Sequence, residues 1–154
     1  EDSFYDEILK QYPHAGRVRN QTYQLLQHAK AACVTSGTAT LETALFGVPE
    51  VICYRGSAVS YQIAKKLIKV KYISLVNLIM DRPVVKELIQ DEMTAANIVT
   101  ELKKLLDDPQ TIERIGKDYA ELKDLLSHGG NASEKAAEII TGYLKNPQPS
   151  TANG

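Results

Sequence analysis

A short polar turn between two apolar segments holds the residues of this chain that are best suited to chemistry. Ser36, Gly37 and Thr38 follow an apolar segment, and Glu42 lies four residues after Thr38. Glycine can adopt positive φ and lets backbone approach a ligand, while serine or threonine can cap the first free N–H groups of a helix. Hydroxyls and a free helix N-terminus together favour an anion, and phosphate is the natural candidate.

The carboxylate of Glu42 is expected one turn into the following helix, on the same face as Thr38. It would repel a phosphate in direct contact, so its expected partner is another part of the ligand, most simply the two hydroxyls of a ribose. A second interpretation is an ordinary capping box, in which the polar residues serve the helix alone. The short S-G-T-x-x-x-E motif taken by itself favours this second interpretation.

Apolar segments around the turn predict the elements that position it. The expected strands are 31–34, 50–55 and 72–76, and the expected helices between them are 39–46 and 58–70. Gly47 and Pro49 end the first of these helices. Alternating strands and helices predict an α/β fold, a parallel sheet with helical crossovers.

Helices are predicted on both sides of this region. They are expected at 1–12 and 21–29, with a short strand at 16–19 between them, and at 84–90, 94–106, 109–126 and 132–144. Asn20, Thr94 and Asp108 suit helix caps. The predicted organisation is a partial Rossmann-like region over 1–82, helices packed on it over 83–145, and a disordered tail over 146–154.

Polar residues follow the predicted strands at the edge where such sheets bind ligands, beyond the C-terminal ends of the strands. The Ser36–Thr38 turn follows the first strand, Arg55 ends the second, and Asn77 follows the third. Arg55 is a candidate counter-charge for phosphate, or a surface ion-pair partner. Asn77 is a candidate ligand of a sugar or base, or a helix cap. This convergence strengthens the interpretation of the turn as a ligand site.

The composition predicts one ordinary soluble domain: 154 residues, 44% of them hydrophobic and 24% charged, with a formal net charge of −1. That balance gives no reason to expect nucleic acid. No apolar run approaches the ~18 residues of a membrane span, so a cytoplasmic location is expected. Cys33 and Cys53 are expected as small hydrophobes in core strands, and no metal or cofactor is expected. A lysine cluster, Lys65, Lys66, Lys69 and Lys71, favours a solvated face over contact with anionic lipid.

Three segments of the chain together resemble the lipid-A-disaccharide synthases. They are T-S-G-T-A-T-L-E-T-A-L-F-G-V-P-E-V-I-C-Y-R from Thr35, S-Y-Q-I-A-K-K-L-I-K-V-K-Y-I-S-L-V-N-L-I from Ser60, and E-L-I-Q-D-E from Glu87. The resemblance spans about Asn20 to Tyr143. The S-G-T-A-x-L-E and Y-I-S-L-x-N-L motifs are specific in combination, whereas either alone would suit other sugar-nucleotide proteins.

The resemblance implies a glycosyltransferase of the GT-B fold, whose C-terminal Rossmann-like half holds the donor nucleotide. It implies UDP-2,3-diacylglucosamine as donor, 2,3-diacylglucosamine 1-phosphate (lipid X) as acceptor, and a β-1,6-linked disaccharide and UDP as products. The donor-nucleotide residues expected from the motif and the strand ends are Ser36, Gly37, Thr38, Ala39, Glu42, Arg55 and Asn77. Related enzymes hold uracil near the loop that corresponds to Val18–Gln21.

The chain departs from the family's pattern by beginning inside the C-terminal half. We therefore expect a piece of an enzyme that does not turn over alone, because the carboxylate base is attributed to the missing N-terminal half. The exposed sheet edge predicts strand pairing between copies, such as a homodimer. Acylated substrates suggest peripheral contact with the cytoplasmic face of the inner membrane.

Two alternatives remain open from the residues. The first is a UDP-N-acetylglucosamine 2-epimerase or another sugar-nucleotide enzyme, which would share the turn, the glutamate and the G-V-P strand entry but not the Y-I-S-L-V-N-L segment. The second is a non-catalytic binding or interaction module, in which the turn is only a cap. Failure to bind any uridine nucleotide would favour this second alternative.

Overall fold

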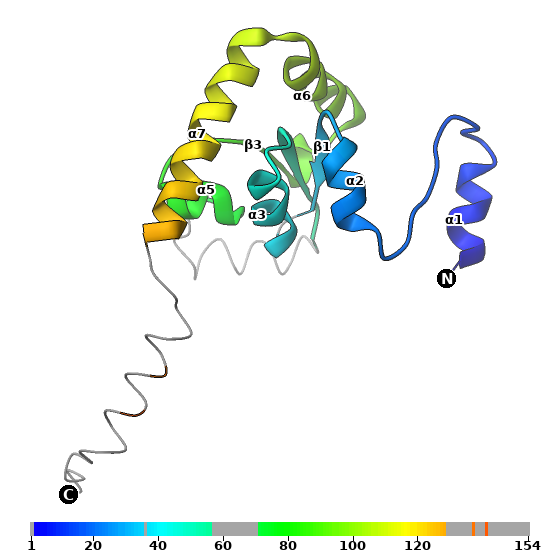
Figure 1. The fold of residues 1–154 in the computed structure, drawn as a ribbon. Coiled ribbons are helices and arrows are strands. Elements are labelled where there is room, and N and C mark those ends of the chain that lie inside the picture. The colour runs from blue at the N-terminus through cyan, green and yellow to red at the C-terminus, as the bar shows by residue number, and fades with distance from the viewer. Residues whose placement is uncertain (1, 36, 57–70, 129–136, 138–140, 142–154) are drawn as a thin grey trace, which may run out of the picture.

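The computed structural model describes residues 2–35, 37–56, 71–128, 137 and 141. In chain order its elements are α1 (Asp2–Leu9), α2 (Thr22–His28), β1 (Ala32–Val34), α3 (Thr38–Leu45), β2 (Glu50–Tyr54), α5 (Leu75–Met80), β3 (Lys86–Ile89), the 3-10 helix η1 (Gln90–Glu92), α6 (Ala95–Asp107) and α7 (Pro109–His128). Figure 1 shows α3, α5, α6 and α7 gathered around the strands, with α1 apart from them.

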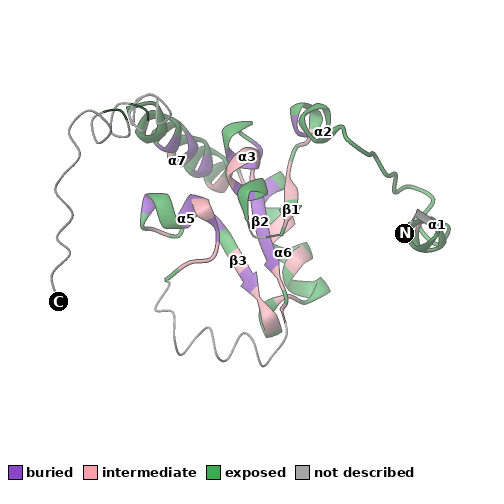
Figure 2. Ribbon diagram, turned by 90° about the horizontal axis from the view of Figure 1, so that it is seen from below, coloured by how far each residue is buried: buried purple, intermediate pink, exposed green. Residues whose placement is uncertain are grey.

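The three described strands form one parallel sheet in the order β1-β2-β3. Val34 pairs with Ile52, which in turn pairs with Glu87. Val51 and Ile52 point to opposite faces of β2 and are both fully buried, so both faces of the middle strand are covered. The covering helices that contact β2 are α3 and α6, which lie on different sides of it in Figure 2.

This architecture confirms the predicted α/β fold with a parallel sheet. The predicted helices at 21–29, 39–46, 94–106 and 109–126 are present within two residues of their expected bounds. Caps explain two of these boundaries: Thr94 Oγ1 accepts from Asn97 N at the start of α6, and Asp108 accepts from Gln110 N at the start of α7. The predicted elements at 58–70 and 132–144 and the tail at 146–154 lie outside the described residues, apart from residues 137 and 141.

The third strand was predicted in the wrong place. Residues 72–76 were expected as a strand, but Ser74 is the N-cap of α5, and the third strand is β3, inside the helix expected at 84–90. Residues 73 and 74 do lie beside β3. Their backbone N–H groups, however, bond to the side chain of Glu87 and not to a neighbouring strand.

Four smaller expectations were also wrong. The helix expected over 1–12 ends at Leu9, and residues 16–19 form no strand. Asn20 does not cap α2, because the N-cap is Gln21 and no side chain caps that helix end. Cys33 is exposed, since β1 is an edge strand of the described sheet and has a neighbour on one side only. None of these differences changes the order of the strands.

A carboxyl group is buried at the start of β2. Glu50 is 1% exposed, and within the described part of the chain neither its carboxyl oxygens nor the buried Tyr119 Oη makes a hydrogen bond. Burial raises the pKa of Glu50 to about 9. Glu50 is therefore neutral at pH 7, which avoids the large cost of an unpaired buried charge.

The stability of the fold should fall as pH rises through the neutral range. Between about pH 4.5, the unfolded value, and about pH 9, folded Glu50 keeps a proton that the unfolded chain has lost. The unfolding free energy should then decline by up to about 1.4 kcal/mol per pH unit. Glu50→Gln should remove this part of the slope in urea unfolding at pH 6, 7 and 8, whereas Glu113→Gln, at an exposed position of α7, should retain it. Equal slopes for wild type and Glu50→Gln would contradict the assignment.

Candidate functional site

The turn between β1 and α3 exposes backbone at the C-terminal end of a parallel strand. Gly37 is the N-cap of α3 with φ 123° and ψ −161°, a conformation that strains any residue with a Cβ. Among the described residues no side chain caps this helix end, so Thr38 is not the cap that the sequence suggested. Gly37, Thr38 and Ala39 are all exposed. Ser36 lies outside the described residues.

Three threonines near the start of α3 differ in what they bond. The hydroxyls of Thr40 and Thr43 donate to the carbonyls of Gly37 and Ala39, both at 2.8 Å. Both residues are buried and serve the helix itself. The Thr38 hydroxyl makes no hydrogen bond within the described part of the chain, and the residue is exposed. Thr38 is the first residue of the helix and not its cap, so its hydroxyl is left for an external partner.

Glu42 follows Thr38 by one turn of α3 and is half-buried. The i to i+4 spacing places the two side chains on the same face of the helix. Its carboxylate forms no ion pair with a described residue. Gly37, Thr38, Ala39 and Glu42 thus all lie at the start or in the first half of α3, and their role in binding a ligand stays a prediction.

Arg55 follows β2 at the same edge of the sheet but reaches in another direction. Its Nη2 donates to the carbonyls of Gln90 and Met93, at 3.4 and 2.9 Å, in the segment that follows β3. Since β3 and β1 flank β2 on opposite sides, this guanidinium is directed away from the α3 turn. The structure does not bring Arg55 together with the residues of that turn.

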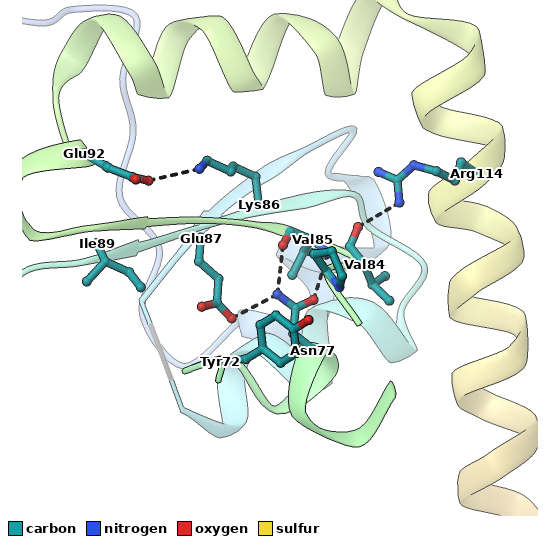
Figure 3. A pocket seen from close by; sticks show the side chains of 10 residues that line it. Tyr72, Asn77, Val84, Val85, Lys86, Glu87, Ile89, Glu92 and Arg114 are labelled. Carbon is teal, nitrogen blue, oxygen red and sulfur yellow. Dashed lines mark hydrogen bonds and ion pairs between the residues drawn. The ribbon is translucent and has the colours of Figure 1, made fainter. Parts of the chain in front are cut away.

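Asn77 was predicted to follow a strand. It lies instead inside α5 and is fully buried. Its Oδ1 accepts from Val85 N at 3.0 Å, and its Nδ2 donates to Val85 O at 2.9 Å and to Glu87 at 3.0 Å. Figure 3 shows this amide against the backbone of Val85. The side chain pairs with the start of β3 much as a neighbouring strand would. The nitrogen and the oxygen of this amide thus already have protein partners. The assignment of Asn77 to a donor pocket stays a prediction.

Glu87 on β3 completes this arrangement, and the sequence analysis missed it. Its carboxylate accepts from the backbone N–H groups of Ile73 and Ser74, from Ser74 Oγ and from Asn77 Nδ2, at 2.8 to 3.2 Å. Ser74 Oγ in turn accepts from Asn77 N. The only signal in the sequence was the S-x-x-N spacing, which suits an N-cap followed by the first turn of a helix.

A pocket of about 450 Å³ lies along β3 beside this network. Its lining residues are Tyr72, Asn77, Pro83, Val84, Val85, Lys86, Glu87, Ile89, Glu92 and Arg114. Lys86 is paired with Glu92 at 3.0 Å, and Arg114 donates to Val84 O at 3.1 Å. The charged groups of the pocket thus already have protein partners.

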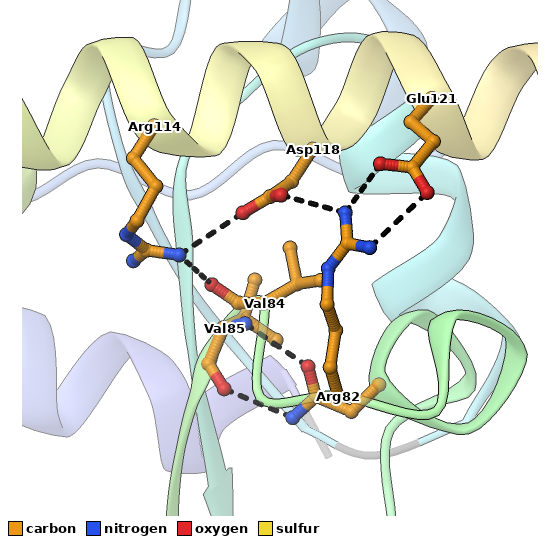
Figure 4. Close-up of polar contacts among 7 residues, drawn as sticks. Arg82, Val84, Val85, Arg114, Asp118 and Glu121 are labelled. Atoms are coloured by element: carbon orange, nitrogen blue, oxygen red, sulfur yellow. Dashed lines mark hydrogen bonds and ion pairs between the residues drawn. The ribbon is translucent and has the colours of Figure 1, made fainter.

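Arg82 fastens the segment between α5 and β3 to α7. Its guanidinium bonds to Asp118 and Glu121, and Arg114 bonds to Asp118 and to the carbonyl of Val84 (Figure 4). The hydrogen bonds to Glu121 and Asp118 raise the pKa of Arg82. The hydrogen bond from Arg82 lowers the pKa of Glu121. α7 is thereby held against the strand that carries Glu87.

The two cysteines are poorly suited to nucleophilic or metal chemistry. Cys33 and Cys53 are free thiols on neighbouring strands, and desolvation raises the pKa of both, that of Cys53 to about 11. Protonated thiols are poor nucleophiles and poor metal ligands. Among the residues described here, no group of histidine, cysteine or acidic side chains is arranged for a metal ion, and no helix has the length and apolarity of a membrane span.

Comparison with known proteins gives one consistent result. The family model for lipid-A-disaccharide synthetase matches residues 7–141. The chain is 42% identical over 126 residues to the lipid-A-disaccharide synthase of Geobacter metallireducens (82% of this chain, 33% of the relative) and 46% identical over 108 residues to that of Acidobacterium capsulatum (70% and 27%). It is 40% identical over 141 residues to that of Syntrophus aciditrophicus (91% and 37%). The chain spans about a third of the length of these curated relatives.

The buried amide of Asn77 should be important for stability. Asn77→Ala leaves the N–H and C=O of Val85 without partners in a buried place, which should lower the unfolding free energy by about 2–4 kcal/mol. Asn97→Ala is a matched control, because the amide of Asn97 also bonds a backbone carbonyl but is exposed. That control should cost less than about 1 kcal/mol. Urea unfolding measures both, and similar losses in the two variants would contradict the role given to Asn77.

Proposed function

The chain belongs to the lipid-A-disaccharide synthetase family, and from this premise we propose that the turn at the start of α3 binds the diphosphate of a UDP-sugar donor. The observation that carries the proposal is the exposed N-terminus of α3, which no described side chain caps and where Gly37 adopts positive φ after a parallel strand. Backbone N–H groups at such a helix end are directed at an anion and reinforced by the helix dipole.

The whole enzyme would transfer 2,3-diacylglucosamine from its UDP donor to lipid X and release UDP. Negative charge grows on the leaving diphosphate during this transfer. The N–H groups of Gly37, Thr38 and Ala39, with the Thr38 hydroxyl, would stabilise that charge as an oxyanion hole does, without a metal. A base that deprotonates the acceptor hydroxyl would come from the part of the relatives' length that this chain does not match.

Glu42 would bind the ribose of the same nucleotide. It lies one turn beyond Thr38 on the same face and has no ionic partner among the described residues. A carboxylate in this position can accept hydrogen bonds from both ribose hydroxyls while the diphosphate occupies the helix end. Ser36, which precedes Gly37, would add a further hydroxyl to the diphosphate site.

Further parts of the proposal concern the whole enzyme. A division after residue 82 would separate β3 from the sheet that it forms with β1 and β2, so we assign the nucleotide-binding region to the chain through β3, with α6 and α7 packed on it. Lipid substrates favour a place on the cytoplasmic face of the inner membrane, with peripheral contact to lipid. The edge of β1 that has no neighbouring strand among the described residues favours association with another strand, from a second copy or from the rest of the enzyme.

Calorimetric titration with UDP and with pyrophosphate separates the two roles. Thr38→Ala should lower the affinity for UDP and for pyrophosphate about tenfold, as expected for the loss of a hydrogen bond to a charged group. Glu42→Gln should lower the affinity for UDP about fivefold and the affinity for pyrophosphate less than about twofold, because pyrophosphate has no ribose.

Two variants on α6 serve as controls: Thr100→Ala at an exposed position and Glu101→Gln at a half-buried one. Both should bind UDP as wild type does. Equal losses of UDP and pyrophosphate in Glu42→Gln would refute the ribose contact. A folded wild-type chain whose UDP affinity is unaffected by Thr38→Ala would refute the diphosphate site.

A further inference from the structure

The side chain of Thr40 holds the carbonyl of Gly37 at the start of α3. Its Oγ1 donates to Gly37 O at 2.8 Å, and the Thr40 N–H donates to the same oxygen at 3.2 Å. Thr40 is fully buried, so its hydroxyl is shielded from water. One residue thus makes two hydrogen bonds to this carbonyl, and the bond from the side chain is the shorter one.

The carbonyl of Gly37 is held differently from those at two other helix starts. The N-cap carbonyls of α2 and α6, on Gln21 and Thr94, accept from the N–H four residues later, both at 2.9 Å. The Gly37 carbonyl accepts from the N–H three residues later, at the longer distance of 3.2 Å. A longer hydrogen bond restrains the carbonyl less, so the Thr40 hydroxyl supplies more of the restraint at α3.

The orientation of this carbonyl decides where the N–H of Thr38 points. The carbonyl and the N–H of a trans peptide unit lie in one plane and point in opposite directions. Because the Gly37 carbonyl points along the helix to Thr40, the Thr38 N–H points the other way, out of the N-terminal end of α3. Gly37 has φ 123° and no Cβ, so rotation of this peptide meets little steric resistance. The two bonds from Thr40 oppose that rotation.

We propose that Thr40 is a positioning residue for the diphosphate site, because its hydroxyl keeps the Thr38 N–H directed at the ligand. This role rests on the function proposed above and adds to it a buried residue that would not touch the donor. An N–H fixed in advance needs no reorganisation when charge develops on the leaving diphosphate. Without the hydroxyl, ligand binding would also have to order the peptide, which lowers affinity.

Thr43 provides a matched control on the same helix. It is also buried, and its hydroxyl donates to Ala39 O at 2.8 Å, the same distance as for Thr40. The N–H of that peptide unit belongs to Thr40 and already donates to Gly37 O. The peptide that Thr43 holds therefore has no N–H left for a ligand, whereas the peptide that Thr40 holds does.

Calorimetric titration of the full chain with pyrophosphate and with UDP compares three variants. Thr40→Val removes the hydroxyl but nearly keeps the volume, and it should lower the affinity for both ligands about fivefold. Thr40→Ser keeps the hydroxyl and should bind both within about twofold of wild type. Thr43→Val should also bind within about twofold of wild type, although its urea midpoint should fall about as far as that of Thr40→Val, since both lose a buried hydrogen bond.

Amide relaxation tests the same role without a ligand. In the free chain, Thr40→Val should add microsecond-to-millisecond exchange broadening at the Thr38 amide, as expected of a peptide that rotates, and Thr43→Val should not. Equal relaxation of this amide in the two variants would overturn the role of Thr40. An affinity loss in Thr40→Ser or Thr43→Val as large as that in Thr40→Val would also overturn it, because binding would then follow packing or stability.

Two outcomes separate the role of Thr40 from the proposed function. A loss of UDP affinity in Thr38→Ala but not in Thr40→Val would overturn the role of Thr40 and leave the diphosphate site standing. A wild-type chain that binds neither UDP nor pyrophosphate would refute the proposed function. Amide relaxation would then decide alone whether Thr40 holds this peptide.

Discussion

The hydrogen bonds of the Asn77 amide to the backbone of Val85 are the constraint on which the second half of the structure depends. They hold α5 against β3, and Glu87 reinforces them by accepting from the backbone ahead of α5. The short segment between α5 and β3 then presents Arg82 to α7. α7 in turn contributes Ile115, Tyr119 and Leu122 to the core shared with α3 and the sheet. A buried amide thus helps to position the helix whose N-terminus is the candidate site.

Much of the fold could be predicted because local signals and tertiary packing agree. Small and β-branched residues define β1 and β2, Gly47 and Pro49 end the first crossover helix, and Thr94 and Asp108 cap α6 and α7. The prediction of a strand at 72–76 was wrong because the sequence signals in this segment conflict. A short apolar run is compatible with a strand or with a buried helix start, and periodicity cannot separate the two. Only the long-range partners of Glu87 and Asn77 decide between them.

In the candidate site, too, some features could be predicted from the local sequence and others depend on distant contacts. A turn with glycine after β1 was predictable, because few residue types allow positive φ there, but Thr38 was a candidate cap and is instead the first residue of α3. The direction of Arg55 was not, since it depends on two backbone carbonyls more than thirty residues away. Asn77 was expected to bind a sugar or base or to cap a helix, and its amide bonds to Val85 and Glu87. Polar residues near the end of a sheet can bind a ligand or complete the fold, and the sequence alone does not tell these roles apart.

The middle strand separates two groups of polar residues. Gly37, Thr38 and Glu42 lie with β1 and α3, and Arg55 reaches toward β3. The central claim is that the first group binds the donor nucleotide. Its most direct test is a map of amide chemical shifts of the full chain during titration with UDP. The account predicts saturable shifts centred on residues 37–42. Shifts centred instead on the pocket beside β3, around Tyr72 and Glu87, would contradict it.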